Sequence, residues 1–245
     1  MTAGVQPLAY GTAVAVGALA CGGLCLGARR HPGPWTIAAA RGIGLMLLAD
    51  VVAWTVALIR SDTWSTQTSL PLALCNLAAV VAAVACLSRV PVLVELTYFW
   101  GLAGALQAVV TPDLDVGFPH LVFFEYVVGH LGIVAAALYL VVGLRLVPGP
   151  GAALRVFAIT VGYTSFVGLV DWLSGADYMF LRSPPSNWTL LRILGPWPWY
   201  IMSAAGVGLV LIVVLDMPFW PGRRRRTAQL SGGTPPAGRD TWARC

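Results

Sequence analysis

Seven apolar stretches run through this chain of 245 residues, and each is long enough to cross a lipid bilayer. A membrane-spanning helix needs about 20 mostly apolar residues. The sequence therefore predicts an all-α, polytopic membrane helix bundle with seven transmembrane helices. The expected spans are residues 8–28, 36–60, 70–88, 92–110, 119–146, 152–173 and 196–217.

The overall composition leads to the same fold class. Hydrophobic residues make up 58% of the chain and charged residues 10%, a balance at which a soluble domain of this length would aggregate. We therefore expect one compact helical bundle. The net charge of +5 comes from arginine alone, since the sequence has no lysine, and it reflects membrane orientation rather than a nucleic-acid partner.

The arginines are divided unevenly between the two ends of the predicted helices. Arg60, Arg182 and Arg192 fall on one side, and the other twelve arginines fall on the opposite side. Cytoplasmic loops carry an excess of positive residues, so the N-terminus is predicted to lie outside and the C-terminus in the cytoplasm. The first span follows no positive charge, so we interpret it as a helix and not as a signal peptide. The chain is expected to be a multi-pass protein of the cell membrane.

The chain is predicted to consist of a transmembrane domain followed by a tail. Residues 1–217 form the transmembrane domain, and residues 218–245 form a disordered basic tail in the cytoplasm. Four consecutive arginines begin at Arg223, so we expect this tail to lie near anionic lipid headgroups. The external segment Ser174–Gly195 is either a lid over a site or an ordinary surface loop.

Cys75 and His130 are the candidate catalytic residues. Counted at 1.5 Å per residue, Cys75 lies about 8 Å below the outer end of its predicted helix and His130 about 16 Å below the outer end of another. Two tilted helices would bring these side chains together. A histidine that accepts the thiol proton turns a cysteine into a nucleophile, so this pair suits acyl transfer.

A purely structural role is the alternative for both residues. Cys75 belongs to a stripe of small side chains with Ala79, Ala82 and Cys86, and such stripes allow close packing between membrane helices. A histidine within a membrane helix also serves as a hydrogen-bonded strut between helices.

Other polar residues of the outer half are candidates for substrate binding or support. Asn76 and Gln107 are possible donors to an oxyanion, and Tyr126 shares a helix face with His130. Asp50 and Asp171 are expected to bind substrate, orient His130 or carry protons, because buried carboxylates in a membrane are costly. Glu125 belongs to the same set, although it projects away from His130. No cysteine or histidine cluster has the spacing of a zinc site, and we expect neither a metal nor another cofactor.

Six motifs between residues 70 and 200 are distinctive: LPLALCN at 70–76, LTYFWGLAGALQA at 96–108, TPDL at 111–114, GH at 129–130, GADYM at 175–179 and LGPWPWY at 194–200. They resemble the YwaF-type family of bacterial membrane proteins, which is similar to vertebrate transmembrane protein 164. That protein is an acyltransferase that loads fatty acyl chains onto ether phospholipids through a cysteine. The resemblance implies an acyl-cysteine intermediate, with Cys75 as the nucleophile and His130 as the base. It also implies membrane lipids, phospholipid or lysophospholipid, as partners.

Two functions of other classes remain open on the sequence. A proton-linked transporter or channel would depend on Asp50, Glu125, His130 and Asp171 and would not need the thiol. A non-catalytic membrane partner or sensor would instead use the Ser174–Gly195 segment as its exposed feature.

Overall fold

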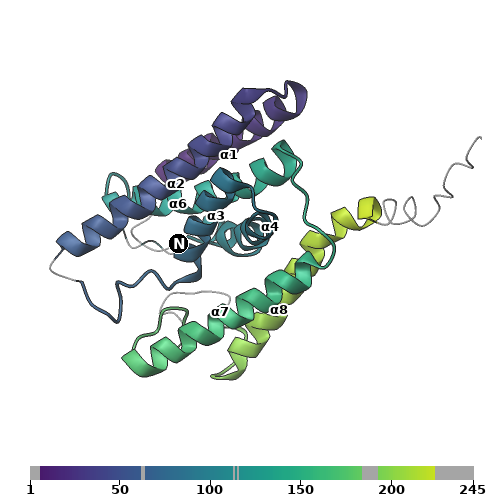
Figure 1. The fold of residues 1–245 in the computed structure, drawn as a ribbon. Coiled ribbons are helices and arrows are strands. Elements are labelled where there is room, and N and C mark those ends of the chain that lie inside the picture. Colours follow the sequence, from purple (N-terminus) through teal and green to yellow (C-terminus); the bar gives the residue numbers. More distant parts are fainter. Residues whose placement is uncertain (1–5, 62–63, 113, 115, 184–192, 224–245) are drawn as a thin grey trace, which may run out of the picture.

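The computed structural model describes residues 6–61, 64–112, 114, 116–183 and 193–223, and this part of the chain is all-helical (Figure 1). Short π-helical turns, η1 and η2, join or extend two of the helices, and a 3-10 turn, η4, follows the last. The elements are α1 Pro7–Arg30, α2 Pro34–Arg60, α3 Leu74–Ser88, α4 Pro91–Trp100, η1 Gly101–Ala105, α5 Leu106–Val110, α6 Leu121–Leu138, η2 Tyr139–Gly143, α7 Ala152–Ser174, α8 Trp199–Asp216 and η4 Met217–Phe219.

Within the described ranges, six helical segments are long and apolar enough to cross a membrane. α4, η1 and α5 run on as one of them, and α6 with η2 forms another. Many large apolar side chains face outward, such as Leu19 at 77% exposure and Trp172 at 75%. Such a surface suits lipid rather than water. The expectation of a helical membrane protein is thus confirmed, while the count of seven spans and the orientation of the termini remain predictions.

The third predicted span is shorter than expected. Its helix, α3, has 15 residues and begins at Leu74, not at residue 70. Residues 65–73, which we call the 65–73 loop, form turns closed by bonds such as Ser69 N–H to the Ser65 carbonyl at 2.9 Å. Pro71 has no N–H to donate, and Ala73 is extended, so the helix begins after both.

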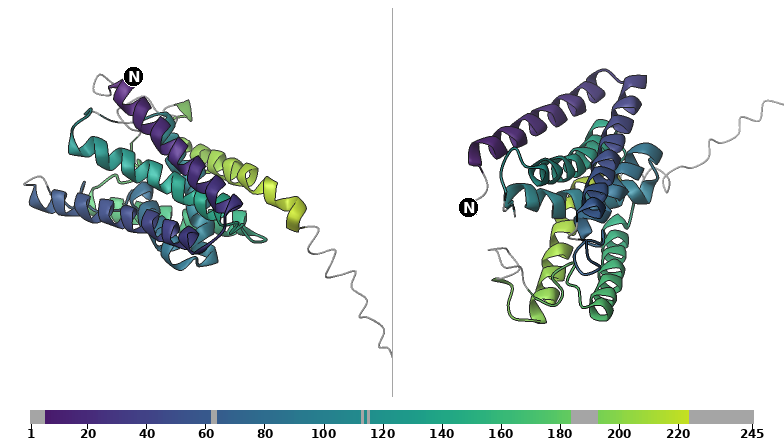
Figure 2. Two further views of the ribbon diagram at one scale, coloured as in Figure 1. Left: turned by 90° about the horizontal axis from the view of Figure 1, so that it is seen from above. Right: turned by 90° about the vertical axis from the view of Figure 1, so that its left-hand side faces the viewer.

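The centre of the bundle is formed by α3, α4 and α6 (Figures 1 and 2). Helix α2 packs on α3 and α6, α1 packs on α6 and η2, and α7 packs on α4 and α8. Small residues permit the closest of these approaches. A Cβ added to Gly44 of α2 would lie 2.9 Å from the Ala83 carbonyl oxygen of α3. Of the predicted stripe, Ala79, Ala82 and Cys86 are buried, as close packing requires.

The helices alternate in direction, so the bundle has two ends. We call the end where α3 begins the Cys75 end and the end where α3 stops the Arg89 end. At the Arg89 end, buried Glu95 of α4 binds Arg155 of α7 with both carboxylate oxygens at 2.9 Å, and it also accepts the Gly149 N–H at 3.0 Å. This network ties α7 to the centre of the bundle.

A second charged network lies at the same end. Arg223 donates to both oxygens of Asp216 at 2.8 Å and to the Pro148 carbonyl oxygen at 2.7 Å. The helical path that begins at Trp199 continues through η4 as far as Arg223. Residues 224–245, most of the predicted tail, lie outside the described residues.

Candidate functional site

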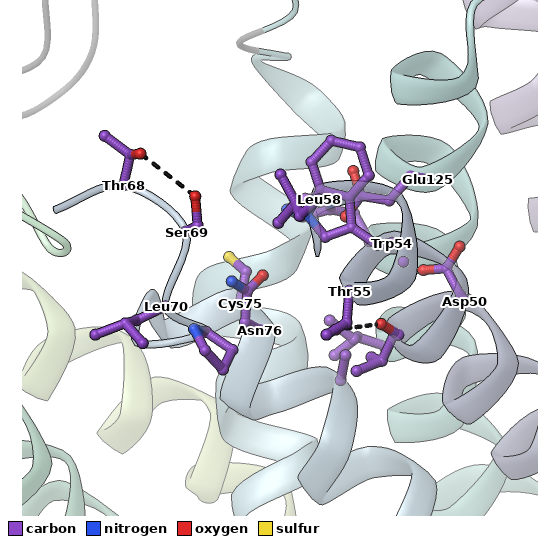
Figure 3. Close-up of a pocket in the computed structure, with 16 residues that line it drawn as sticks. Asp50, Trp54, Thr55, Leu58, Thr68, Ser69, Leu70, Cys75, Asn76 and Glu125 are labelled. Atoms are coloured by element: carbon purple, nitrogen blue, oxygen red, sulfur yellow. Dashed lines mark hydrogen bonds between the residues drawn. The ribbon is translucent and has the colours of Figure 1, made fainter. Parts of the chain in front are cut away.

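A cavity of about 140 Å³ lies toward the Cys75 end, between α2, the 65–73 loop, the start of α3 and the first half of α6. Figure 3 shows its lining, with Cys75 and Asn76 at the start of α3 and Asp50 on α2. The loop leads directly into α3, whereas α6 comes from a later part of the chain, so the cavity exists only in the folded chain. Its lining residues are Asp50, Val51, Trp54, Thr55, Leu58, Thr68, Ser69, Leu70, Pro71, Cys75, Asn76, Ala79, Glu125, Gly129, His130 and Ile133.

Cys75 lies in the first turn of α3 because the helix begins only at Leu74. The sequence predicted a helix that begins at residue 70 and so placed Cys75 more than one turn into it. That predicted depth was wrong, because Cys75 is in the first turn. The first N–H groups of a helix have no partner within it, and Ala73 before the helix offers no side-chain acceptor. These groups and the helix dipole favour negative charge at this position, which offsets part of the effect that burial and the Glu125 charge have on a thiolate.

His130 is held in one ring orientation by its own helix. Its Nδ1 lies 2.8 Å from the carbonyl oxygen of Tyr126, and a carbonyl only accepts, so Nδ1 carries the hydrogen of this bond. In the neutral ring the lone pair is then on Nε2. The ring of Tyr126 lies against the imidazole, with ring centroids 4.2 Å apart. His130 therefore has a fixed tautomer with Nε2 as its proton acceptor.

Two carboxylates share the cavity with the thiol and the imidazole. Asp50 comes from α2 and Glu125 from α6; the charge of Asp50 acts on Glu125, and the charge of Glu125 acts on Cys75. The approach of α2 to α6 is close here, since a Cβ on Gly129 would lie 3.3 Å from Oδ2 of Asp50. Neither carboxylate forms an ion pair with an arginine or histidine of the described chain.

Only some of the predicted supporting residues line the cavity. Asn76 and Asp50 line the cavity with the two catalytic candidates. Tyr126 does not line it but contacts His130, and its hydroxyl donates to the Ala108 carbonyl at 2.9 Å. Gln107 is exposed on α5, outside the cavity lining.

Asp171 is also outside the cavity, but it is linked to the cavity wall. The side chain is fully buried at the end of α7 and accepts the N–H of Tyr178 with both oxygens at 3.1 Å. The Tyr178 hydroxyl in turn donates to the Thr66 carbonyl at 2.6 Å and accepts the Leu70 N–H at 3.1 Å. We call this chain of hydrogen bonds the Tyr178 strap.

The strap ties the 65–73 loop to α7. Tyr163, which is on α7 itself, donates to the Leu72 carbonyl at 2.9 Å and holds the other end of the loop. The described residues of the Ser174–Gly195 segment thus brace one wall of the cavity. Pro184, Pro185 and Asn187 of that segment lie outside the described residues.

Several lining residues were not predicted. Trp54 and Leu58 follow Asp50 at intervals of four residues, so helical periodicity places all three on one face of α2. That signal was present in the sequence. Nothing local to residues 65–73 indicated that Thr68 and Ser69 reach the same cavity, because the loop is positioned by α7.

In chemical terms the cavity combines a thiol at a helix N-terminus, an imidazole with an available nitrogen, an amide and two carboxylates. Within the described residues no group of histidine, cysteine, aspartate and glutamate has the geometry to hold a metal ion. The combination is suited to nucleophilic attack by sulfur with proton transfer to nitrogen.

Comparison with known proteins gives the chain a family. An uncharacterized protein of Treponema pallidum (strain Nichols) is 25% identical over 190 residues, which are 76% of this chain and 76% of that protein. No solved structure matches the chain. The predicted relation to transmembrane protein 164 is confirmed, because the TMEM164 family matches residues 5–216, nearly the whole chain. The chain therefore belongs to the TMEM164 family.

Proposed function

We propose that this protein is a lipid acyltransferase that moves an acyl chain between phospholipids through a thioester on Cys75. The observation that carries the proposal is that Cys75, Asn76 and His130, from two separate helices, line one cavity inside an apolar bundle. Membership of the TMEM164 family agrees with the resemblance seen in the sequence motifs, which implies an acyl-cysteine intermediate.

The first half-reaction forms the thioester. His130 Nε2 accepts the Cys75 thiol proton, and the sulfur attacks the carbonyl carbon of an acyl ester. The oxyanion that develops is stabilised by the Asn76 side-chain amide and by the backbone N–H groups of Leu74 and Cys75 at the start of α3. The ester C–O bond then breaks, and the leaving lysophospholipid hydroxyl takes the proton from His130.

The second half-reaction returns the enzyme to its initial state. A hydroxyl group of the acceptor, a lysophospholipid, gives its proton to His130 Nε2 and attacks the thioester carbonyl. The C–S bond breaks, the acyl chain is now an ester of the acceptor, and the thiolate recovers its proton from His130. No cofactor is required in either half, because one ester bond is exchanged for another.

The size of the cavity defines which part of the lipid enters it. An engineered protein cavity of about 150 Å³ holds one benzene molecule. A cavity of about 140 Å³ therefore accommodates the ester and a few adjoining carbons. The remainder of the acyl chain stays among the lipids, and Trp54 and Leu58 offer it apolar surface at the cavity wall.

The test uses the full chain, purified and reconstituted with a phospholipid that has one labelled acyl chain and an unlabelled lysophospholipid. We expect a labelled thioester on the Cys75 peptide by mass spectrometry and label in the acceptor lipid. Cys75→Ala abolishes both signals, and His130→Ala slows thioester formation by about 10²–10⁴-fold. Cys86→Ala is the matched control, because Cys86 is on the same helix but buried away from the cavity.

A transporter or channel predicts the opposite pattern. Transport that survives Cys75→Ala but is lost in Asp50→Asn or Glu125→Gln would overturn the acyl-cysteine proposal. The proposal would also be overturned if no label appears on Cys75 and all variants transfer the acyl chain at the same rate.

A further inference from the structure

A second cavity, of about 350 Å³, lies at the Arg89 end, away from the Cys75 site. It is lined by the last turn of α1, the loop into α2, the end of α3 and the segment after η2. Three arginines from three of these elements surround it: Arg29, Arg89 and Arg145. The other lining residues are Ala28, Pro32, Thr36, Ile37, Gly143, Leu144 and Leu146.

Within the described residues, no carboxylate neutralises the charge of these three arginines. In the described chain the carboxylates near this end are Glu95 and Asp216. Glu95 is bound by Arg155 and Asp216 by Arg223. No ion pair joins a carboxylate of the described residues to Arg29, Arg89 or Arg145. Three guanidinium groups are therefore left around one cavity without a protein anion.

The backbone at two of these arginines is in the left-handed region. Arg89 has a φ of 57° at the end of α3, and Arg145 has a φ of 58° just after η2. Glycine is the usual residue at such helix ends, because a side chain destabilises the left-handed conformation. Arginine at both positions lowers the stability of these helix ends, and both residues line the same cavity.

The positive-inside bias explains why arginines collect at one end of a membrane protein. It does not explain why two of them occupy strained helix ends, or why three meet at one cavity. Helix C-termini favour cations, but this effect needs no cavity.

We propose that this cavity binds a phosphate group, and that Arg29, Arg89 and Arg145 bind its oxygens. Guanidinium groups match phosphate oxygens in geometry and charge. The group belongs either to an anionic phospholipid of the adjacent leaflet or to a soluble phosphate compound. The site is separate from the Cys75 cavity, so the proposal goes beyond the acyltransferase function and does not depend on it.

The test measures thermal stability of the full chain in nanodiscs. One arm replaces phosphatidylcholine by phosphatidylglycerol, and the other titrates inorganic phosphate into phosphatidylcholine discs. Arg89→Gly and Arg145→Gly are the variants, since glycine suits the left-handed backbone and keeps the fold. Arg41→Gln is the matched control, an exposed arginine of α2 outside the cavity lining.

We expect stabilisation by phosphatidylglycerol, by phosphate or by both, and the arm that responds identifies the source. Each glycine variant should weaken apparent binding by about tenfold to a hundredfold, and Arg41→Gln should leave it unchanged. The unliganded glycine variants should unfold at the wild-type temperature or above it. The proposal is overturned if neither arm stabilises the protein, or if Arg41→Gln weakens binding as much as Arg89→Gly.

Discussion

Removing the hydroxyl of Tyr178 should expose the thiol of Cys75. Tyr178→Phe keeps the ring but deletes two hydrogen bonds, the one to the Thr66 carbonyl and the one from the Leu70 N–H. A hydrogen bond contributes about 1 kcal/mol net, so the 65–73 loop loses about 2 kcal/mol of attachment to α7. The population with a detached loop then rises by up to about thirtyfold.

The assay is the rate of maleimide alkylation of Cys75 in purified protein. The background variant has Cys21, Cys25 and Cys86 replaced by alanine and Cys245 by serine, so that Cys75 is the only thiol in the chain. When loop closure is faster than alkylation, the rate follows the open population. Tyr178→Phe should therefore raise it by up to about thirtyfold.

Tyr10→Phe is the matched control for this experiment. Its hydroxyl also donates to a backbone carbonyl, that of Val109 at 2.8 Å, but neither residue lines the cavity. Asp171→Asn keeps an acceptor for the Tyr178 N–H, so it should raise the rate less than Asp171→Ala. An unchanged rate in Tyr178→Phe, or an equal rise in Tyr10→Phe, would refute the strap as the element that closes the cavity.

Three further predictions concern packing and charge. Arg155→Ala leaves Glu95 buried without its cation and should destabilise the fold by about 3 kcal/mol in a thermal unfolding assay, while Arg41→Ala should have little effect. Gly44→Ala should destabilise by about 1–3 kcal/mol, because the new Cβ would lie 2.9 Å from the Ala83 carbonyl, whereas Gly42→Ala has open space and should be neutral or stabilising. Gly129→Ala, with its Cβ 3.3 Å from Asp50 Oδ2, should slow thioester formation several-fold at nearly unchanged thermal stability, with Gly104→Ala as the control in open space.

The sequence predicted the helices well because a bilayer imposes their length and hydrophobicity. It also nominated five residues that line the cavity, Asp50, Cys75, Asn76, Glu125 and His130. Polar residues are expensive in an apolar bundle, so they are confined to places where other polar groups meet them. For these residues, the type of side chain was sufficient to predict that they face a shared polar site.

Two of the supporting residues, Gln107 and Asp171, lie away from the cavity for different reasons. Gln107 follows the π-helical turn Gly101–Ala105, in which an extra residue rotates everything after it by about 100° relative to a regular helix. If the helix face of Gln107 is predicted with 3.6 residues per turn throughout, the predicted face is therefore rotated away from the actual one. Asp171 is on the expected helix, but it is engaged by a backbone N–H seven residues later, which no periodicity reveals.

The positions of Gln107 and Asp171 both depend on irregular backbone. Irregular backbone also decides how a lipid reaches Cys75. Regular helices fix the depth of Cys75 and His130, but the cavity around them is completed by irregular backbone in the 65–73 loop, which α7 holds through Tyr163 and Tyr178. A glycerolipid headgroup is polar and cannot pass between tightly packed apolar helices without a large desolvation cost. The 65–73 loop is the wall of the cavity that is attached by only a few hydrogen bonds. Detaching it costs about 1 kcal/mol for each bond that breaks. We therefore expect lipid entry to occur at the loop, and expect Tyr178→Phe to raise the rate of substrate capture as well as that of alkylation.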